Sequence, residues 1–565
     1  MPGLWALKHY RRSWLAKDIA AGLVVTSLLV PAGMSYAVAA GLPAITGLYA
    51  TIAPLLAYAL FGPSRIMVVG PDSALAAMIA AAVVSRAAND PERATALASV
   101  LAILTGVFCV LAGLFRAGFV TDLVSKPVRV GYMNGIALTV LVAQLPKLLG
   151  FSGGAGNLGD ALSGLVRGVI SGRTNRAALL IGATCLLFIH FSRKVRPRFP
   201  GVLAAVVAST LAVSLLGLRN QIAVVGMVPW GLPLPALPRV AIGDVRDMAV
   251  AALGIALVSY ADMSVLSRTF AARNGYRVDS NRELVGLGIA NISSGFFRGF
   301  PVTSSSSRTP VAEAAGSKTQ LTGVVGALAI VTLLVAAPSL LQNLPTTALA
   351  AIVVAAALLL FDVRSLALFR RVRPSDFILS ILAFLAVATL GVLWGILVSI
   401  ALSVLDVLRR AWHPHDAVLG RAAGIKGYHD VTRYPAARQV PGLLLFRWDA
   451  PLFFANADTF RARVIELVDS ATQPVLWVVI ASEPITDVDT TAAEMLQELD
   501  TELAARGAEL AFAEMKDPVK DRLKRYELHA TIGHEYFFPT LGVAVKTFID
   551  RFGVEWNDWE SKPNA

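Results

Sequence analysis

The sequence predicts a polytopic α-helical membrane protein that continues into a soluble α/β domain. Of its 565 residues, 56% are hydrophobic and only 16% are charged, whereas soluble domains are about 25% charged. Long stretches of the first part contain no charged residue, and charged residues become frequent after about Pro414. We therefore expect a membrane transport domain at 1–410, a linker at 411–440 and a soluble domain at 441–555.

The uncharged stretches are long enough to cross a bilayer. A helical span needs about 20 apolar residues, so the two longest stretches must each hold two spans. The stretches without Asp, Glu, Lys or Arg are 19–64, 94–115, 199–218, 319–361 and 377–405.

The basic residues predict the number and orientation of the spans. The net charge is +12, but the basic residues gather in short segments, which argues against nucleic-acid binding. Cytoplasmic loops carry an excess of Lys and Arg, so an even number of spans should separate each neighbouring pair of segments. This gives about fourteen spans with both termini in the cytoplasm. The basic segments are 8–17, 116–129, 193–198, 268–282, 364–373 and 409–410.

The spans repeat in two halves, at about 15–218 and 245–410. Each half contains a short segment, 65–84 or 297–316, that has a few extended residues, a proline and then a Ser- or Thr-rich helix start. Each of these helices is too short to cross. Seven spans per half is an odd number, so the second half should be inverted relative to the first.

Paired half-helices of this kind point their N-termini at an anionic substrate in many secondary transporters. Free backbone N–H groups and the helix dipole give each N-terminus a partial positive charge. We expect donors from Ser306 and Ser307 on one side and from the backbone of Ser73, Ala74 and Leu75 on the other. The alternative is a pair of ordinary hydroxyl-rich loops.

Two charged residues fall inside membrane segments, where a charge is costly and is a functional candidate by default. Arg308 follows four serines and would attract an anion; alternatively it pairs with Glu313 or with Asp262. Asp262 lies far from other charges in sequence, and we expect it to carry a coupling proton; alternatively it is a fixed partner of Arg308.

Other function classes find little support in the sequence. There is no G-x-x-x-x-G-K-[ST] loop for an ATP-driven pump. The seven histidines are scattered and show no metal or catalytic-triad spacing. We therefore expect no catalytic residues, no metal and no cofactor. An anion channel built on the same scaffold is an alternative.

The soluble domain alternates strand and helix patterns. We expect strands at 443–448, 475–480 and 509–514 and helices at 457–468, 491–506 and 541–552, an order typical of a sheet covered by helices.

Four stretches spread over nearly the whole chain form a recognisable set: VPAGMSYAVAAGLPAITGLYATIAPLLAYALFG, VGPDSALAAM, SRTFAARNGYRVDSNRELVGLGIANISSGFFRGFPVTSSSSRT and LFFANADTFRARV. With these stretches the sequence resembles the bacterial sulfate permease (SulP) family with a C-terminal STAS domain. The resemblance implies two inverted seven-span repeats, core and gate domains, elevator-type alternating access, a homodimer in the bacterial inner membrane, and a cytoplasmic STAS domain.

The resemblance also implies particular site residues. It places substrate between the half-helices of spans 3 and 10, with Met34 and Tyr36 of span 1 lining the cavity. The family usually has glutamine where this chain has Ala32. In related anti-sigma-factor antagonists a residue at the position of Thr490 is phosphorylated; the alternative is a helix cap at Asp489 or Thr490.

The expected activity is secondary transport of an anion, with sulfate favoured by the resemblance and proton symport as the coupling. Bicarbonate, dicarboxylates and anion exchange are alternatives. Sodium coupling is less favoured, because Arg308 would repel the cation.

Overall fold

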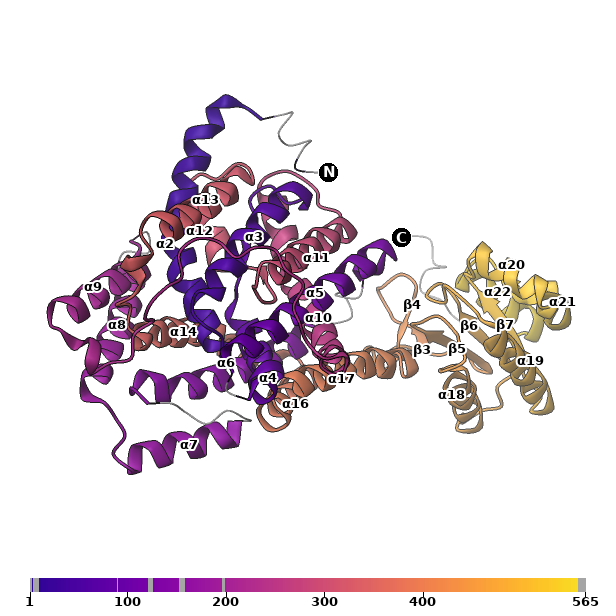
Figure 1. Cartoon of the computed structure of the whole chain (residues 1–565). Helices are drawn as coiled ribbons and strands as arrows, with labels where there is room; N and C mark the ends of the chain where they lie inside the picture. Colours follow the sequence, from indigo (N-terminus) through magenta and orange to yellow (C-terminus); the bar gives the residue numbers. More distant parts are fainter. Residues whose placement is uncertain are drawn as a thin grey trace. The chain divides into compact units, whose positions relative to one another are not determined.

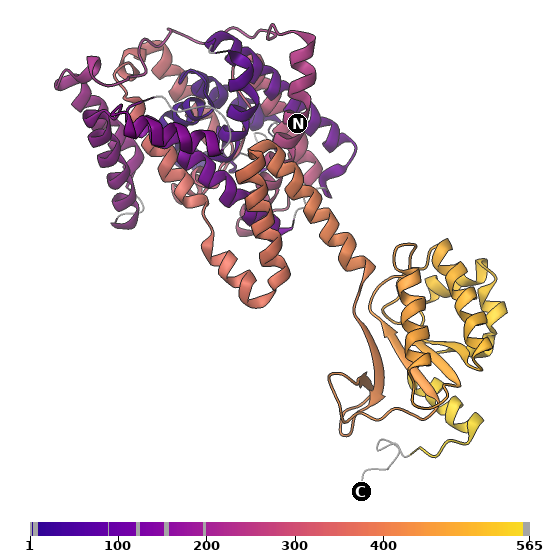
Figure 2. The same cartoon turned by 90° about the horizontal axis from the view of Figure 1, so that it is seen from below.

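The computed structural model describes Gly3 and residues 10–88, 90–119, 125–151, 158–195 and 199–556. Lys8, Arg196 and Arg198 of the basic segments lie outside these residues. The chain forms two compact units, Met1–Val404 and Leu405–Ala565, which Figures 1 and 2 draw in sequence colours.

The first unit is helical. Its first half contains η1 (Arg12–Trp14), α2 (Leu15–Ala39), α3 (Thr46–Phe61), β1 (Val69–Gly70), α4 (Ser73–Ala87), α5 (Pro91–Leu114), α6 (Lys126–Leu148), α7 (Leu158–Ile170), α8 (Arg176–Val195), α9 (Gly201–Leu215) and η3 (Leu218–Asn220). Its second half contains α10 (Ile242–Arg273), α11 (Ser280–Phe296), β2 (Thr303–Ser304), α12 (Arg308–Ala314), α13 (Leu321–Ala336), η4 (Pro338–Leu341), α14 (Thr346–Leu360), α15 (Val363–Val372), α16 (Pro374–Leu390) and α17 (Val392–Trp412).

The two halves have the same order of elements. In each, two helices precede a two-residue strand and a short helix, and five more helices follow. The sixth α-helix of each half, α7 in the first and α15 in the second, is amphipathic. Without them, this unit contains fourteen α-helices with described bounds, as expected from the basic segments.

The matching strands run in opposite directions. β1 pairs antiparallel with β2, with Val69 opposite Ser304 and Gly70 opposite Thr303. Opposite directions in equivalent elements are the relation that an inverted repeat requires. The extended residues that the sequence predicts in each short segment therefore join the two half-helices through a small ladder.

Helix contacts divide this unit into two groups. The first, which we call the core group, consists of α2, α3, α4, α5, α10, α11, α12 and α13; the second, the gate group, consists of α6, α7, α8, α9, α14, α15 and α16. Contacts between the groups come from α2 and α4, which touch α6, α9 and α14. The elements that flank the broken helices thus belong to one packed body.

Small residues let helices of the core group approach closely. A Cβ atom at Gly106 of α5 would lie 2.5 Å from the carbonyl oxygen of Gly288 in α11, and one at Gly288 would lie 2.6 Å from that of Gly106. Small residues at crossings are the usual way in which membrane helices pack tightly.

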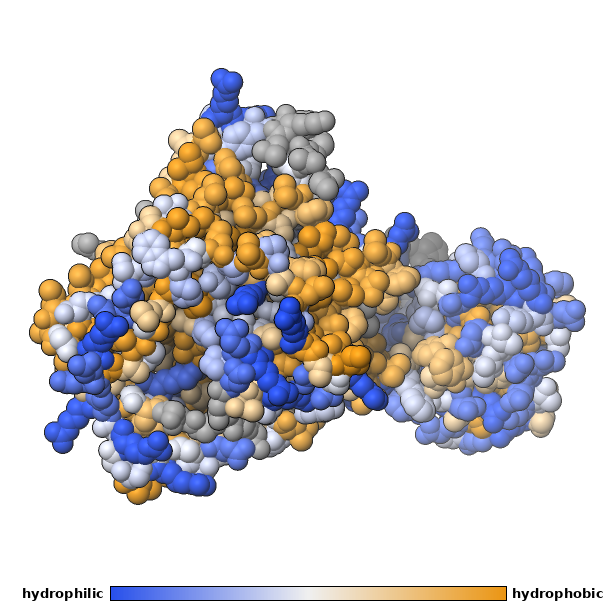
Figure 3. Space-filling model, viewed as in Figure 1, coloured by the Kyte–Doolittle hydropathy of each residue, from blue (hydrophilic) through white to orange (hydrophobic). Residues whose placement is uncertain are grey.

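Apolar side chains cover much of the first unit. Figure 3 shows hydrophobic residues spread over its surface, while the second unit is mainly hydrophilic. Six helical segments among the described residues are each long and apolar enough to cross a membrane, including Pro91–Leu114 and Ile242–Arg273. This surface suits a lipid environment.

The second unit is a six-stranded sheet with helices on both faces. The strand order is β4-β3-β5-β6-β7-β8, and β5, β6, β7 and β8 are parallel neighbours. Helices α18, α19, α20 and α21 pack in one hydrophobic cluster and α22 in the other. The elements are β3 (Asp416–Arg421), β4 (Tyr428–Asp430), β5 (Leu443–Trp448), α18 (Ala457–Asp469), β6 (Trp477–Ala481), α19 (Thr490–Ala505), β7 (Glu509–Ala513), α20 (Asp517–Arg525), α21 (Leu528–Ile532), η5 (His534–Tyr536), β8 (Phe537–Phe538) and α22 (Leu541–Phe552).

The interpretation of 411–440 as a linker is wrong in part, because β3 and β4 belong to the sheet. β3 pairs antiparallel with β5, placing Val418 opposite Phe446. The segment was missed because β3 lacks a long apolar run and its partner strand is distant in sequence.

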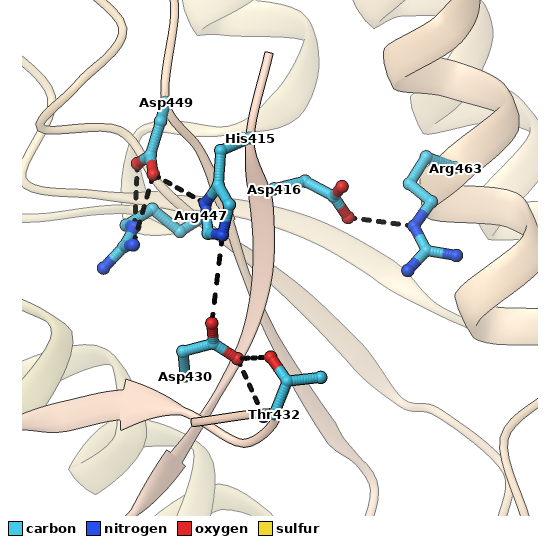
Figure 4. Close-up of polar contacts among 7 residues, drawn as sticks. All are labelled: His415, Asp416, Asp430, Thr432, Arg447, Asp449 and Arg463. Atoms are coloured by element: carbon cyan, nitrogen blue, oxygen red, sulfur yellow. Dashed lines mark hydrogen bonds and ion pairs between the residues drawn. The ribbon is translucent and has the colours of Figure 1, made fainter. Parts of the chain in front are cut away.

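Polar contacts also bind this segment to the domain (Figure 4). His415 Nδ1 lies 3.0 Å from Asp449, and Arg463 Nε of α18 donates to Asp416 at 2.9 Å. Hydrogen bonds from the Thr432 side chain and backbone hold the pKa of Asp430 below its usual range, so its carboxylate stays charged near His415.

Candidate functional site

Arg308 is the first residue of α12, and its side chain reaches across to the other half of the repeat. The residue is 2% exposed, and its Nη2 donates a short hydrogen bond to the carbonyl oxygen of Pro71. Nη1 lies 3.6 Å from the place where a Cβ atom on Gly70 would stand. The guanidinium of Arg308 therefore lies in van der Waals range of β1.

Two guanidinium nitrogens of Arg308, Nε and Nη1, have no hydrogen-bond partner among the described residues. A buried charged group without partners is costly. Such a group is stabilised when an anion occupies the free donors, since guanidinium matches the oxygen pairs of carboxylate- and sulfate-like anions. This is the strongest indication of an anion site in the chain.

The start of α4 faces Arg308, but its donors are partly used by the chain itself. Asp72 is the N-cap residue of α4, and its Oδ1 accepts a hydrogen bond from the Ala74 N–H at 3.0 Å. Ala74 is therefore not a free donor here, which corrects the prediction for it. Ser73 and Leu75 are buried at this helix start, and their role as substrate donors stays a prediction.

The start of α12 also differs from the prediction. α12 has only seven residues, so its dipole is small. The Arg308 N–H donates to Ser305 Oγ at 3.2 Å. Ser306 and Ser307 form an exposed turn before the helix. The groups that this segment contributes to the candidate site are therefore mainly the Arg308 side chain and this turn.

Tyr36 and Met34 are separated by the structure. Tyr36 is 6% exposed and lies close to Ser73, Asp72 and Arg308. The first unit has two large hydrophobic clusters, and Met34 packs in a different one from Tyr36, with residues such as Leu48 and Leu349. Residues two apart on a helix point about 200° apart, so the structure brings only Tyr36 to the arginine. Ala32 packs on the same cluster as Tyr36.

Neither predicted ion-pair partner of Arg308 contacts it. Glu313 lies 3.7 Å from Arg273 and accepts a hydrogen bond from Asn274 at 2.9 Å. The charged neighbours of Asp262 are Asp72 and Arg129, and Tyr132 lies near it. The alternative of a fixed pair with Arg308 is therefore wrong for both residues. Asp72 lies near both Arg308 and Asp262.

Thr490 belongs to the second unit. Asp489 is the N-cap of α19 and accepts from the Ala492 N–H at 2.9 Å, so the cap belongs to Asp489. Thr490 is exposed, and its hydroxyl lies 3.2 Å from that of Tyr526.

Two buried carboxylates were missed because their partners are distant in sequence. Glu283 of α11 accepts from Tyr58 at 2.5 Å and from Ser64. Asp18 of α2 accepts from the Lys318 N–H at 2.6 Å and from Thr319 and Thr322 before and at the start of α13. A carboxylate inside an apolar helix was the available signal.

Among the described residues, no three His, Cys, Asp or Glu side chains gather in a way that could hold a metal ion.

Comparison with known proteins agrees with this architecture. The profile of the Sulfate permease family matches residues 15–383, and that of the STAS domain matches residues 434–544. A probable sulfate transporter of Mycobacterium tuberculosis is 42% identical over 548 residues, covering 97% of this chain and 98% of that protein.

More distant relatives share the arrangement. Human solute carrier family 26 member 6 is 32% identical over 81% of this chain and 63% of its own length. The structure of the murine Slc26a9 anion transporter superposes with a TM-score of 0.88 at 23% identity, covering 97% of this chain and 93% of that one. The transmembrane domain of the cyanobacterial bicarbonate transporter BicA superposes with a TM-score of 0.61 at 23% identity, covering 70% and 98%. At these identities the two structures establish the fold.

Proposed function

The chain belongs to the sulfate permease family, and on that premise we propose that it is a secondary active transporter that carries sulfate across the bacterial inner membrane. The family is one of transporters and not of enzymes. The relative that shares 42% of its residues over nearly the whole chain is named a probable sulfate transporter. Transport of an anion is the function that the free guanidinium donors of Arg308 serve best.

Substrate binding is assigned to the space beside Arg308 at the β1–β2 ladder. The Nε and Nη1 donors of Arg308 would hold two oxygens of the anion, and Tyr36 and Ser73 lie within the same cluster. Backbone N–H groups at Leu75, Ser306 and Ser307 complete the proposed set of donors. Met34 and Ala74 are not part of this set, because Met34 packs in a different hydrophobic cluster from Tyr36 and the Ala74 N–H donates to Asp72.

Movement of the core group against the gate group would expose this site to each side in turn. The site lies between two half-helices of one packed group, while the gate group touches that group through few elements. An elevator motion of this kind needs no large change inside either group. We propose that it occurs in a homodimer whose termini and STAS domain lie in the cytoplasm.

Uptake by the purified full-length chain in proteoliposomes tests the function. We expect labelled sulfate to accumulate when the lumen is made alkaline relative to the outside, and excess unlabelled sulfate to block it. Bicarbonate and dicarboxylates are tested in the same assay. Accumulation or exchange of another anion in place of sulfate would change the substrate; transport of none of them would refute the carrier function.

Asp262 is the proposed carrier of the coupling proton. Its carboxyl group lies inside α10 near Asp72, where a proton relieves repulsion between two like charges. We expect Asp262→Asn to retain sulfate exchange while losing accumulation driven by a pH gradient. Accumulation that responds to the pH gradient as in the wild type would contradict this role.

A further inference from the structure

Asp72 places a carboxylate where the substrate anion is expected. We propose that Asp72 is a built-in competitor of the substrate: its carboxylate caps the start of α4 and lies in the field of Arg308, so the anion binds tightly only when a proton neutralises one of the two carboxylates, Asp72 or Asp262. This inference rests on the proposed function and adds a residue that sets affinity and its pH dependence.

The geometry puts the carboxylate over the N-terminus of α4. Asp72 has an extended backbone, its Oδ1 accepts from the Ala74 N–H at 3.0 Å, and its carbonyl oxygen accepts from the Ala76 N–H at 3.1 Å. An anion at the first turn of a helix is stabilised by the helix dipole. The chain therefore already supplies, at this half-helix, the negative charge that a substrate would bring.

The second observation is Arg308, whose side chain is 2% exposed and directed to the same place. Arg308 and Asp72 interact electrostatically, and Tyr36 of α2 interacts with both. Even so, Nε and Nη1 of Arg308 keep no hydrogen-bond partner among the described residues. The site thus retains donors for an incoming anion, together with a carboxylate that repels that anion.

The third observation is a second carboxylate beside the first. Asp262 of α10 interacts with Asp72, and on its other sides it faces Arg129 and Tyr132 of α6. Asp72 itself faces Arg308 of α12, Tyr36 of α2 and Asp262. With both carboxyl groups ionised, their two negative charges offset the positive charges of Arg308 and Arg129, and Asp72 weakens the attraction of Arg308 for an anion. A proton taken from water onto this pair removes one charge, and it returns to water when the anion leaves.

The expected consequence is that sulfate binds more weakly as the pH rises. Both carboxyl groups are then ionised, and each repels the anion across a partly buried site. A sulfate carrier with one proton on the pair would release sulfate and the proton together on the alkaline side.

The test compares Asp72→Asn and Asp72→Ser with Asp90→Asn. Asparagine and serine also cap helices, so both variants at Asp72 remove the charge and keep the cap. Asp90 is a matched control, since it caps α5 in the same way, accepting from the Glu92 N–H at 2.9 Å, and it is exposed. Sulfate KM is measured in proteoliposomes from pH 6 to pH 8, and sulfate-dependent thermal stabilisation is measured on the purified protein.

We expect the wild-type KM to rise with pH and that of Asp72→Asn to stay low. At pH 8 the KM of the variant should be about tenfold lower than that of the wild type, because one negative charge near the anion has been removed. Sulfate should stabilise the variant against heating at lower concentrations than the wild type, while Asp90→Asn matches the wild type. The serine variant gives the same comparison if the asparagine variant is not recovered.

The inference would be overturned if both Asp72 variants kept the wild-type KM and pH profile, or if both had a KM above that of the wild type. The first result would make Asp72 a cap alone, and the second would make it part of the attractive site. Failure of the proposed function looks different, because the wild type would then neither transport nor be stabilised by any anion tested.

Discussion

At the scale of single residues, the site depends on the state of a few polar groups. Arg308 is buried, and its Nε and Nη1 have no hydrogen-bond partner among the described residues. The carboxyl group of Asp72 lies near Arg308 and near that of Asp262. Buried donor nitrogens without partners are costly, and in a membrane segment they are functional candidates. These two nitrogens of Arg308 are therefore the basis of the proposed anion site.

Replacement of Arg308 should strongly reduce transport without unfolding the protein. Hydrogen bonds to a charged group contribute about 1.5–3 kcal/mol, so Arg308→Gln should lower sulfate kcat/KM by roughly 10- to 100-fold. Arg308→Lys should restore little, since an ammonium lacks the planar pair of donors. The control is Arg364→Gln, an exposed arginine on α15. Equal rates in both variants at position 308 and the wild type would remove Arg308 from the site.

At the scale of elements, close helix crossings hold the broken helices in place. α5 and α11 cross at Gly106 and Gly288, and α11 leads directly into the β2 segment. The β1–β2 ladder then fixes the two half-helix starts relative to each other. The packed pair of α5 and α11 therefore anchors the segments of the candidate site, because α4 leads into α5 and α11 leads into the β2 segment.

Gly106→Ala should destabilise the membrane unit. The added Cβ atom would lie 2.5 Å from the Gly288 carbonyl oxygen, which forces the helices apart at a cost of about 1–3 kcal/mol. The control is Gly243→Ala in α10, where a Cβ atom meets nothing within 4 Å. Thermal unfolding in detergent measures both variants. A melting temperature lowered equally by both would show that the crossing is not the cause.

At the scale of the whole membrane unit, a hydrogen bond joins the two helix groups. Lys147 in the last turn of α6 donates from Nζ to the carbonyl oxygen of Val38 at 2.6 Å, near the C-terminus of α2. A cation suits the negative end of a helix. An elevator motion of the core group against the gate group would have to break this contact in every cycle.

Lys147→Met should therefore shift the protein away from the conformation described here. Loss of one charge-assisted hydrogen bond, about 1.5–3 kcal/mol, changes the ratio of two conformations by roughly 10- to 100-fold. Distances between spin labels on α2 and α6 measure this ratio. Lys126→Met, an exposed residue of the same helix, is the control. An unchanged distance distribution would show that the contact does not bias the conformations.

The sequence by itself determined the fold class, the repeat and the broken helices. Hydropathy, basic segments and helix-start residues are local signals, and span number, strand-then-helix order and STAS secondary structure depend mainly on local signals. The strands 443–448 and 509–514 and the helix 541–552 were found to within a residue or so. Arg308 and Asp262 could be named as candidates from the sequence, because a charge in a membrane segment is visible without any structure.

The tertiary structure alone decided which of these groups meet. It pairs Glu313 with Arg273, turns Met34 away from Tyr36 and sets Asp72 near both Arg308 and Asp262. It also places β3, from the segment expected to be a linker, beside β5. These contacts join elements far apart in the chain, so they depend on how helices and strands pack in space, which no local pattern of residues records.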